Sequence, residues 1–384
     1  MKLIYINPGN SSVMEAQVLE LLNYYLLSGS FESLFLLQGY KRESEKIALC
    51  EKLEHYPQIK IKWFKSYPNY SFFNLIAYRS LKKILLDVGI GNKTVIHTRG
   101  EIYGSFAKRF LRKAKLPINL LVDIRGVSID EISIYRESNK LLKQNKVYNL
   151  LNHYKNLKKS NDTMITVVSK HAKDYFVTKY HFDESKICVH PNIVGKQFEF
   201  SLIKRLEIRK KLGVSKNQLI ALCSSNGAAA WQKDEMIMRK LVNQGIFVLN
   251  LSPKRVDIEG VHTMKVPFQE MPAYLSAADI SVLWREDNPV NNTASPSKMS
   301  EFAAMGLYVI HNNTVGIASD YINKSKAGIL ITDVNQLDTI DFSDISLEKR
   351  ENWCQQGLEL FGIEKLASSY IKKYKDIVSI ITDI

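Results

Sequence analysis

A lysine and a glutamate stand three residues apart where a loop is expected to enter a helix, at Lys298 and Glu301. Pro296 suits the first helical turn, and Ser295 suits the N-cap position. The N–H groups and positive dipole end of such a helix favour a bound phosphate. Lys298 would add a full charge, and Glu301 could accept hydrogen bonds from two neighbouring ribose hydroxyls. The segment predicts a nucleoside diphosphate site, although a capping arrangement on a solvated helix face has the same composition.

The residues on either side of this segment predict the elements that position it. Apolar runs at 279–284 and 308–310 are typical of strands, and residues 296–305 between them have the composition of one short helix. Gly306 is expected to end that helix in a left-handed conformation. The unit is therefore strand, loop, helix, strand, with Lys298 and Glu301 at the carboxyl end of a strand.

A second loop in the same half of the chain could also hold a diphosphate. A strand at 219–223 runs into the small residues Ser225, Asn226 and Gly227, followed by Trp231 and Lys233. Small residues let a diphosphate approach the backbone, and Lys233 could reach it as a point charge. The same sequence is also common turn chemistry.

Polar runs at the ends of other strands supply further candidates. Arg285 opens the run 285–289, where a carboxylate or amide could bind sugar hydroxyls. In the first half of the chain, the segment after the first strand contains Gly9 and Asn10, which could bind an acceptor or a phosphate or form a plain turn.

Charged residues also gather at two strand ends in the first half. These residues are His97, Arg99, Arg125, Asp130 and Glu131. Acids, bases and anion-binding groups belong at such positions, and the arginines would suit a phosphate or carboxylate. The alternative is a structural pairing of arginine with aspartate that fixes two loops.

Strand-like and helical stretches alternate along the whole chain. Strands are expected at 3–6, 33–37, 59–64, 94–97, 118–124, 164–168 and 187–190, then at 219–223, 247–251, 280–284, 308–310 and 327–331. Helices are expected at 13–27, 71–86, 105–114, 141–158 and 348–361. This alternation predicts two Rossmann-like, doubly wound parallel sheets whose carboxyl strand ends share a cleft. The expected domains are 1–193, 194–363, and a helix at 364–384 that crosses back to the first domain.

Composition limits the partners and the compartment. The chain has 384 residues and a formal net charge of +14. Without a nucleic-acid-binding signature, that charge favours phosphorylated substrates or an anionic membrane surface over nucleic acid. The four cysteines stand far apart and predict free thiols in a reducing compartment. With no signal peptide and no membrane-spanning run, we expect a cytoplasmic protein with at most peripheral contact at the inner membrane face.

The stretch 139–159 mixes leucines with lysines in a helical pattern. A basic amphipathic helix of this kind can lie on an anionic membrane. A core-packed helix with a hydrated basic face has the same pattern, and we favour that interpretation.

In order along the chain, these pieces resemble the GT-B glycosyltransferases, specifically the retaining family 4 type that builds bacterial surface polysaccharides. Residues 167–180 and 186–194 are similar to the family's interdomain stretch, residues 268–279 to the helix ahead of its donor loop, and residues 295–306 to its donor-binding segment. The resemblance implies transfer of a sugar from a nucleoside diphosphate sugar to a glycan or lipid-linked acceptor with retained anomeric configuration. A sugar-nucleotide epimerase or hydrolase and a catalytically silent glycan-binding or scaffold protein are the alternatives.

The resemblance also implies residue roles. Glu301 would bind the donor ribose, and Lys298, Lys233, Gly227 and the amides at 295–297, which include Ser297, would bind the diphosphate. The acceptor would face Gly9, Asn10, His97, Arg99, Arg125, Asp130 and Glu131. The chain has no Asp-x-Asp pair to hold a metal-bound nucleotide, so neither metal nor cofactor is expected.

Two positions depart from the family pattern. Thr293 stands where many members carry a second glutamate, and residues 228–230 are alanines where an arginine usually precedes Lys233. Recognition of the donor sugar is therefore less well defined by the sequence than recognition of the nucleotide.

Overall fold

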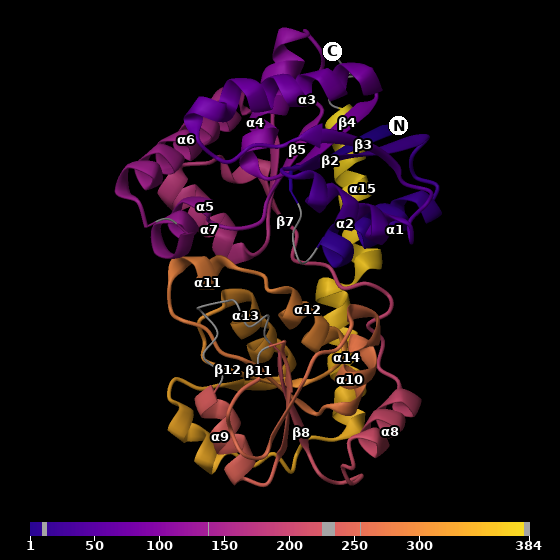
Figure 1. Ribbon diagram of the computed structural model, residues 1–384, viewed down its shortest axis with the longest axis vertical. Coiled ribbons are helices and arrows are strands. Elements are labelled where there is room, and N and C mark those ends of the chain that lie inside the picture. Colours follow the sequence, from indigo (N-terminus) through magenta and orange to yellow (C-terminus); the bar gives the residue numbers. More distant parts are fainter. Residues whose placement is uncertain (10–13, 137, 225–234, 254, 380–384) are drawn as a thin grey trace. The chain divides into compact units, whose positions relative to one another are not determined.

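The computed structural model describes residues 1–9, 14–136, 138–224, 235–253 and 255–379. The chain divides into two compact units (Figure 1). Unit 1 comprises Met1–Pro191 together with the residues from Leu366 on, and unit 2 comprises Asn192–Lys365.

The core of unit 1 is a seven-stranded parallel sheet with the order β3-β2-β1-β4-β5-β6-β7. Its strands are β1 Lys2–Asn7, β2 Ser33–Tyr40, β3 Lys60–Lys65, β4 Thr94–Arg99, β5 Leu120–Ile124, β6 Met164–Val167 and β7 Ile187–Val189. The order reverses between β1 and β4, and ligands of open parallel sheets bind at the carboxyl ends of strands beside such a reversal.

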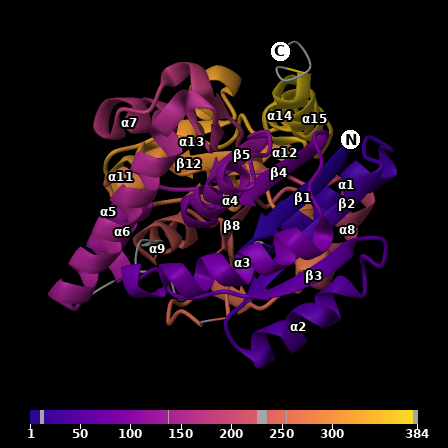
Figure 2. The same ribbon diagram turned by 90° about the horizontal axis from the view of Figure 1, so that it is seen from above.

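Helices cover both faces of this sheet. They are α1 Glu20–Leu27, α2 Glu43–Leu53, α3 Asn74–Val88, α4 Glu101–Lys113, α5 Ser128–Glu131, α6 Lys140–Lys158 and α7 Lys170–Tyr180, with the short helix η2 Ser71–Phe73 ahead of α3. Helix α4 packs against both α3 and α6, and Figure 2 shows the three next to one another. The hydroxyl groups of Tyr25 on α1 and Tyr374 on α15, Ile363–Ser379, make a buried hydrogen bond of 3.3 Å.

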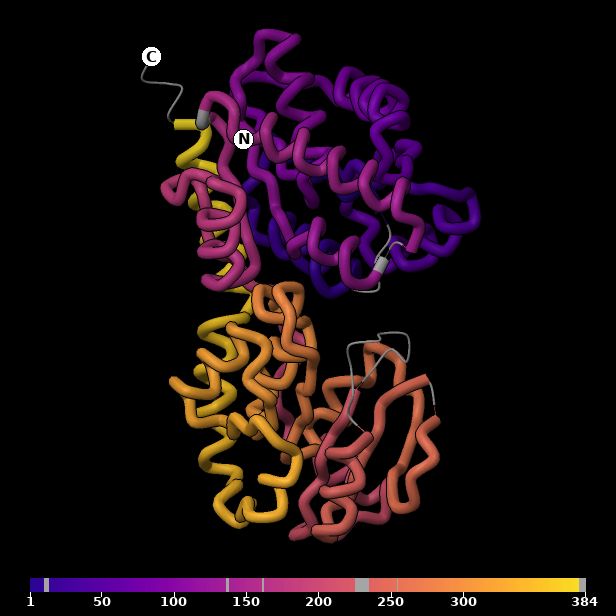
Figure 3. Tube along the Cα trace, turned by 90° about the vertical axis from the view of Figure 1, so that its left-hand side faces the viewer, coloured from indigo at the N-terminus to yellow at the C-terminus, as the bar shows by residue number. Residues whose placement is uncertain are grey.

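The chain of unit 2, which Figure 3 traces, forms a six-stranded parallel sheet. The strand order is β10-β9-β8-β11-β12-β13. The strands are β8 Ile220–Ser224, β9 Phe247–Leu251, β10 Val261–Met264, β11 Ile280–Leu283, β12 Tyr308–His311 and β13 Gly328–Leu330. Its helices are α8 Leu202–Lys211, α9 Glu235–Asn243, α10 Met271–Ala277, α11 Pro289–Thr293, α12 Ser297–Ala304, α13 Gly316–Ser325 and α14 Leu347–Phe361. Separate apolar cores lie on the two faces of the sheet.

The predicted fold class, two doubly wound parallel α/β domains, is confirmed. Local errors have physical causes. Strand β10 is missing from the prediction because it is a partly exposed edge strand without an apolar run. Helix α4 begins at Glu101 rather than at residue 105, because Gly100, with φ 94°, ends the preceding strand directly at the helix start.

Candidate functional site

Helix α12 begins immediately after Pro296, whose backbone is extended at φ −64° and ψ 134°. The N-cap residue is Pro296, which makes no capping hydrogen bond with its side chain, so the prediction that Ser295 is the N-cap is wrong. The Ser295 hydroxyl instead accepts a hydrogen bond from the Asn192 backbone N–H at 3.1 Å, and Ser300 donates to the Asn192 carbonyl at 2.9 Å. These contacts fix the helix start within unit 2 without using a side chain at its N-terminal N–H groups.

Lys298 bridges from this helix to the central strand of the sheet. Its ammonium group donates to the carbonyl of Ser224, the last residue of β8, and the side chain is partly exposed. A lysine charge therefore lies at the carboxyl end of β8, where the predicted diphosphate loop begins.

Glu301 follows one helical turn later on α12 and is half-buried. Burial raises the pKa of its carboxyl group to about 7, and the nearby Lys298 charge offsets part of that rise. The start of α12 thus combines an ammonium group, a helix N-terminus and a carboxyl group poised to change charge near neutral pH.

Several predicted site residues lie outside the residues that the structure describes. They are Asn10, Ser225, Asn226, Gly227, Trp231 and Lys233. Their suggested contacts with a phosphate or an acceptor remain predictions.

Arg285 lies just beyond β11 and joins two loops at the carboxyl edge of the sheet. Its backbone N–H donates to the Asn312 side chain at 3.1 Å, and its guanidinium donates to Asn291 at 3.3 Å. Asn291 is buried and donates in turn to the Glu286 carbonyl at 2.8 Å. The segment 285–291 is therefore held by side-chain amides next to the start of α11.

Thr293, where the sequence resemblance led us to look for a second glutamate, is buried at the end of α11. Its hydroxyl donates to the Pro289 carbonyl at 2.8 Å, one turn earlier in the same helix. No carboxylate reaches the site from this position.

His311, at the end of β12, was not singled out by the sequence. Its Nε2 accepts the Val315 N–H at 3.0 Å, so Nδ1 carries the proton and donates to the Leu283 carbonyl at 2.6 Å. Burial lowers the pKa of this histidine to about 4. A neutral imidazole therefore ties β11 to the loop after β12. A histidine that ends an apolar strand is the only signal that the sequence offers.

In unit 1, the predicted acceptor residues do not form one group. His97 is fully buried, and its Nδ1 lies 2.6 Å from the Tyr374 hydroxyl. Burial lowers the pKa of His97 to about 3. Arg125 donates to Asp123 at 3.2 Å and to the His190 carbonyl at 3.3 Å, which is the structural pairing that the sequence kept as an alternative.

The two acidic residues of α5 lie elsewhere in unit 1. Asp130 accepts hydrogen bonds from Lys179 at 2.7 Å and from the Tyr180 hydroxyl at 3.1 Å, both on α7. Glu131 follows it at the end of α5. Asp130 is thus engaged in holding α5 against α7.

Gly9 and Arg99 do come together, in a cavity of about 580 Å³ that we call the unit 1 cavity. It opens where β1 and β4 end, at the reversal of strand order. Lys41, Tyr67 and Lys146 also line it. Cations and aromatic rings around one hollow suit a ligand that carries both a sugar ring and a negative charge. Sequence patterns could not reveal this set because its members come from separate elements.

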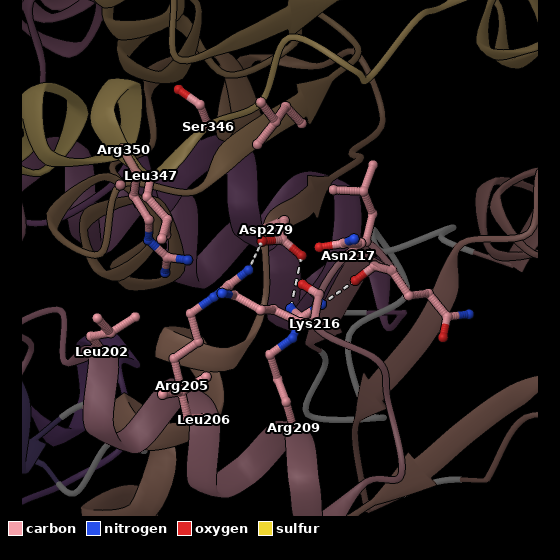
Figure 4. A pocket seen from close by; sticks show the side chains of 14 residues that line it. Leu202, Arg205, Leu206, Arg209, Lys216, Asn217, Asp279, Ser346, Leu347 and Arg350 are labelled. Atoms are coloured by element: carbon pink, nitrogen blue, oxygen red, sulfur yellow. Dashed lines mark hydrogen bonds and ion pairs between the residues drawn. The ribbon is translucent and has the colours of Figure 1, made fainter.

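A second cavity, of about 310 Å³, lies in unit 2 at the amino ends of the strands (Figure 4). Arg205 and Arg209 both reach Asp279 there, as Figure 4 shows. Arg350 donates to the carbonyls of Leu275, Ala278 and Met305. These arginines bind backbone carbonyls at helix ends, so the cavity is part of the scaffold.

Within the described ranges, no group of three or more His, Cys, Asp or Glu side chains is arranged to hold a metal ion. In that same part of the chain, every helix is too short or too polar to span a membrane.

Searches of sequence families and of curated proteins find no match for this chain. Solved structures do match it. A glycosyltransferase from Rickettsia africae superposes with a TM-score of 0.71 at 16% identity, covering 98% of each chain. Anabaena Alr3699/HepE, in complex with UDP and glucose, gives 0.69 at 13% identity over 98% of this chain and 100% of that one. WaaG, a glycosyltransferase involved in lipopolysaccharide biosynthesis, gives 0.62 at 12% identity over 99% of each. The likeness shows that the two units have the GT-B fold.

Proposed function

We propose that this protein transfers a sugar from a nucleoside diphosphate sugar to a glycan or lipid-linked acceptor, in the synthesis of a bacterial surface polysaccharide. The observation that carries the proposal is the start of α12, where Lys298 reaches the end of β8 and Glu301 follows one turn later. The similar structure of Alr3699/HepE, which contains UDP and glucose, supports the choice of donor class.

The proposed catalysis depends on the negative charge that develops on the diphosphate. Cleavage of the donor places negative charge on the departing diphosphate, and Lys298 with the N–H groups of α12 would stabilise that charge more in the transition state than in the ground state. We propose retention of anomeric configuration, since an acceptor that attacks from the face that the diphosphate leaves needs no protein nucleophile. The reaction would need neither metal nor cofactor beyond the donor.

Product analysis tests the proposal. The protein is incubated with a panel of nucleoside diphosphate sugars, with and without extracts of surface glycans and lipid-linked acceptors, in the presence of a chelator. We expect an acceptor-dependent release of nucleoside diphosphate and a new glycosidic bond of the donor's configuration. Conversion of the donor without acceptor would indicate an epimerase instead, and failure to bind any nucleoside diphosphate would indicate a silent scaffold.

Donor affinity should depend on pH through Glu301. Its pKa of about 7 leaves the carboxyl partly protonated near neutrality, whereas two ribose hydroxyls bind best to the ionised form. Donor binding should therefore lower this pKa, and affinity should rise from pH 6 to pH 8 and level off above the free pKa. Titration calorimetry with the intact sugar nucleotide measures this, because its diphosphate does not titrate in that range. A Glu301→Gln variant should bind more weakly and without this pH dependence; a wild-type profile that stays flat would contradict the assignment.

Arg99 should affect the acceptor rather than the donor. Removing its charge from the unit 1 cavity with Arg99→Ala should raise the acceptor KM about tenfold, the loss expected for one charged hydrogen bond. Donor affinity should not change. Arg42→Ala removes an exposed arginine of the same unit and serves as the control. An unchanged acceptor KM for Arg99→Ala would remove this cavity from the acceptor site.

A further inference from the structure

Unit 1 carries a group of large apolar side chains on its surface, which we call the outer patch. Leu141 and Tyr148 of α6 are 76% and 62% exposed, and Phe72 ahead of α3 is 62% exposed. The remaining members of the outer patch are Leu75, Ile76 and Leu151. Soluble monomers rarely gather this much apolar surface without a binding role.

Hydrogen bonds hold the two parts of the outer patch side by side. The Ser71 N–H donates to the Asn145 side chain at 2.9 Å, and the Asn145 amide donates back to the Ser71 hydroxyl at 2.8 Å. One turn further along, Asn74 donates to Asn149 at 2.6 Å. Leu141 and Tyr148 lie four residues before and three residues after Asn145, so they flank this seam on α6.

The apolar side chains of the outer patch are separate from those that α6 contributes to the buried core. Helix α6 already buries Leu150, Tyr154 and Leu157 on its inner face. Leu141 and Tyr148 lie on the opposite face, which the sequence interpretation expected to be merely hydrated and basic, and Leu151 lies between the two faces. The helix is thus apolar on two sides, and only one side is covered.

The two helices that contribute to the outer patch, α3 and α6, are strongly basic. Helix α6 contains no acidic residue, and the only acid of α3, Asp87, pairs with Lys62 at 2.9 Å. The exposed cations of the two helices are Arg79, Lys82, Lys83, Lys140, Lys155 and Lys158. Two copies of so basic a face would repel each other, so self-association does not account for it.

We propose that the outer patch docks on an anionic lipid bilayer. Apolar side chains on a basic helical face enter the boundary between head groups and acyl chains, while lysines bind the lipid phosphates. The side chains that would enter this boundary are Leu141, Tyr148 and Phe72. The exposed cations of α3 and α6 would bind the lipid phosphates.

Docking would also bring the unit 1 cavity to the lipid surface. The Tyr70 ring stacks on Phe72 at 5.2 Å between ring centroids, and Tyr70 also lines the cavity. Lys146, another cavity residue, lies 4.8 Å from the centre of the Tyr70 ring. A role of docking in bringing the cavity to its acceptor rests on the proposed function, because it requires a lipid-linked acceptor. The docking itself does not rest on that function.

Vesicle sedimentation tests the docking with the intact protein and no donor. The protein should co-sediment with vesicles of phosphatidylglycerol mixed equally with phosphatidylcholine. It should not co-sediment with vesicles of pure phosphatidylcholine. The double variant Leu75→Gln with Leu141→Gln should bind the anionic vesicles roughly tenfold more weakly. Reversing the charge of Lys82 and Lys83 to glutamate should weaken binding similarly and reduce its salt dependence.

The matched control is Ile203→Gln with Leu206→Gln on α8 of unit 2, where the two side chains are 71% and 50% exposed, close to the 76% and 52% of Leu141 and Leu75. Its binding should equal that of the wild type, and circular dichroism should show all variants folded. Absence of wild-type binding, equal binding to neutral vesicles, or equal loss in the control would each overturn the proposal. Because no sugar nucleotide is present, these results are independent of whether the protein is a transferase; transfer that fails in a vesicle-binding protein would refute only the proposed function.

Discussion

Replacing Lys298 with methionine should lower turnover by roughly 10²- to 10³-fold, the loss typical for one preorganised donor to a developing anion. Methionine keeps most of the side-chain volume but has no charge to place at the end of β8. The effect should appear in kcat at saturating donor, because the interaction strengthens as the diphosphate leaves. The measurement is release of nucleoside diphosphate with the donor and acceptor pair found by product analysis.

A second lysine provides the control for this substitution. Lys2 donates to the carbonyls of Val88 and Gly89 in unit 1, so Lys2→Met also removes a lysine bonded to backbone oxygen. Its turnover should match that of the wild type. If Lys298→Met turns over normally, the role of Lys298 in leaving-group stabilisation is wrong, and a melting temperature far below that of Lys2→Met would show that the residue acts mainly in folding.

Glu301→Ala should weaken the binding of nucleoside diphosphate by about 100-fold, the consequence of losing two hydrogen bonds to a charged acceptor. Titration calorimetry with a nucleoside diphosphate and its 2′-deoxy analogue makes the experiment specific. The wild type should prefer the ribose form, and the variant should bind both forms equally weakly.

The control for Glu301→Ala is Glu348→Ala, which removes an exposed carboxylate at the start of α14 in the same unit. It should leave affinity and sugar preference unchanged. Retention of the ribose preference by Glu301→Ala would show that another group binds the ribose, and the assignment of the α12 segment would then fail.

The structural features that the sequence predicts best are those that depend on residues close together along the chain. Lys298 and Glu301 lie on one short helix that Gly306 follows with φ 61°, as the local pattern predicts. The alternation of apolar strands with helices suffices for the fold class because each strand of a parallel sheet is a separate apolar run.

Contacts between distant segments could not be predicted. Ser295 has the side chain of a helix cap, but Asn192, more than 100 residues earlier, engages its hydroxyl instead. Lys146 of α6 and Arg99 of β4 line the same unit 1 cavity, and no spacing rule links the two. Likewise, the sequence gives Leu141 and Leu150 the same apolar character, and only packing shows that the first is exposed and the second is buried.

Arg350 makes the two ends of helix α12 electrostatically different. Its Nε donates to the carbonyl of Met305, the C-cap of α12, at 2.9 Å, so a buried cation compensates the negative end of the helix dipole. A hydrogen bond from a charged donor contributes about 1.5–3 kcal/mol, more than the ~1 kcal/mol that a missing N-cap costs. The helix can therefore remain stable while its positive end has no acidic or hydroxyl cap of its own. Stability is concentrated at the end facing the scaffold, and the other end keeps its full electrostatic attraction for an incoming anion.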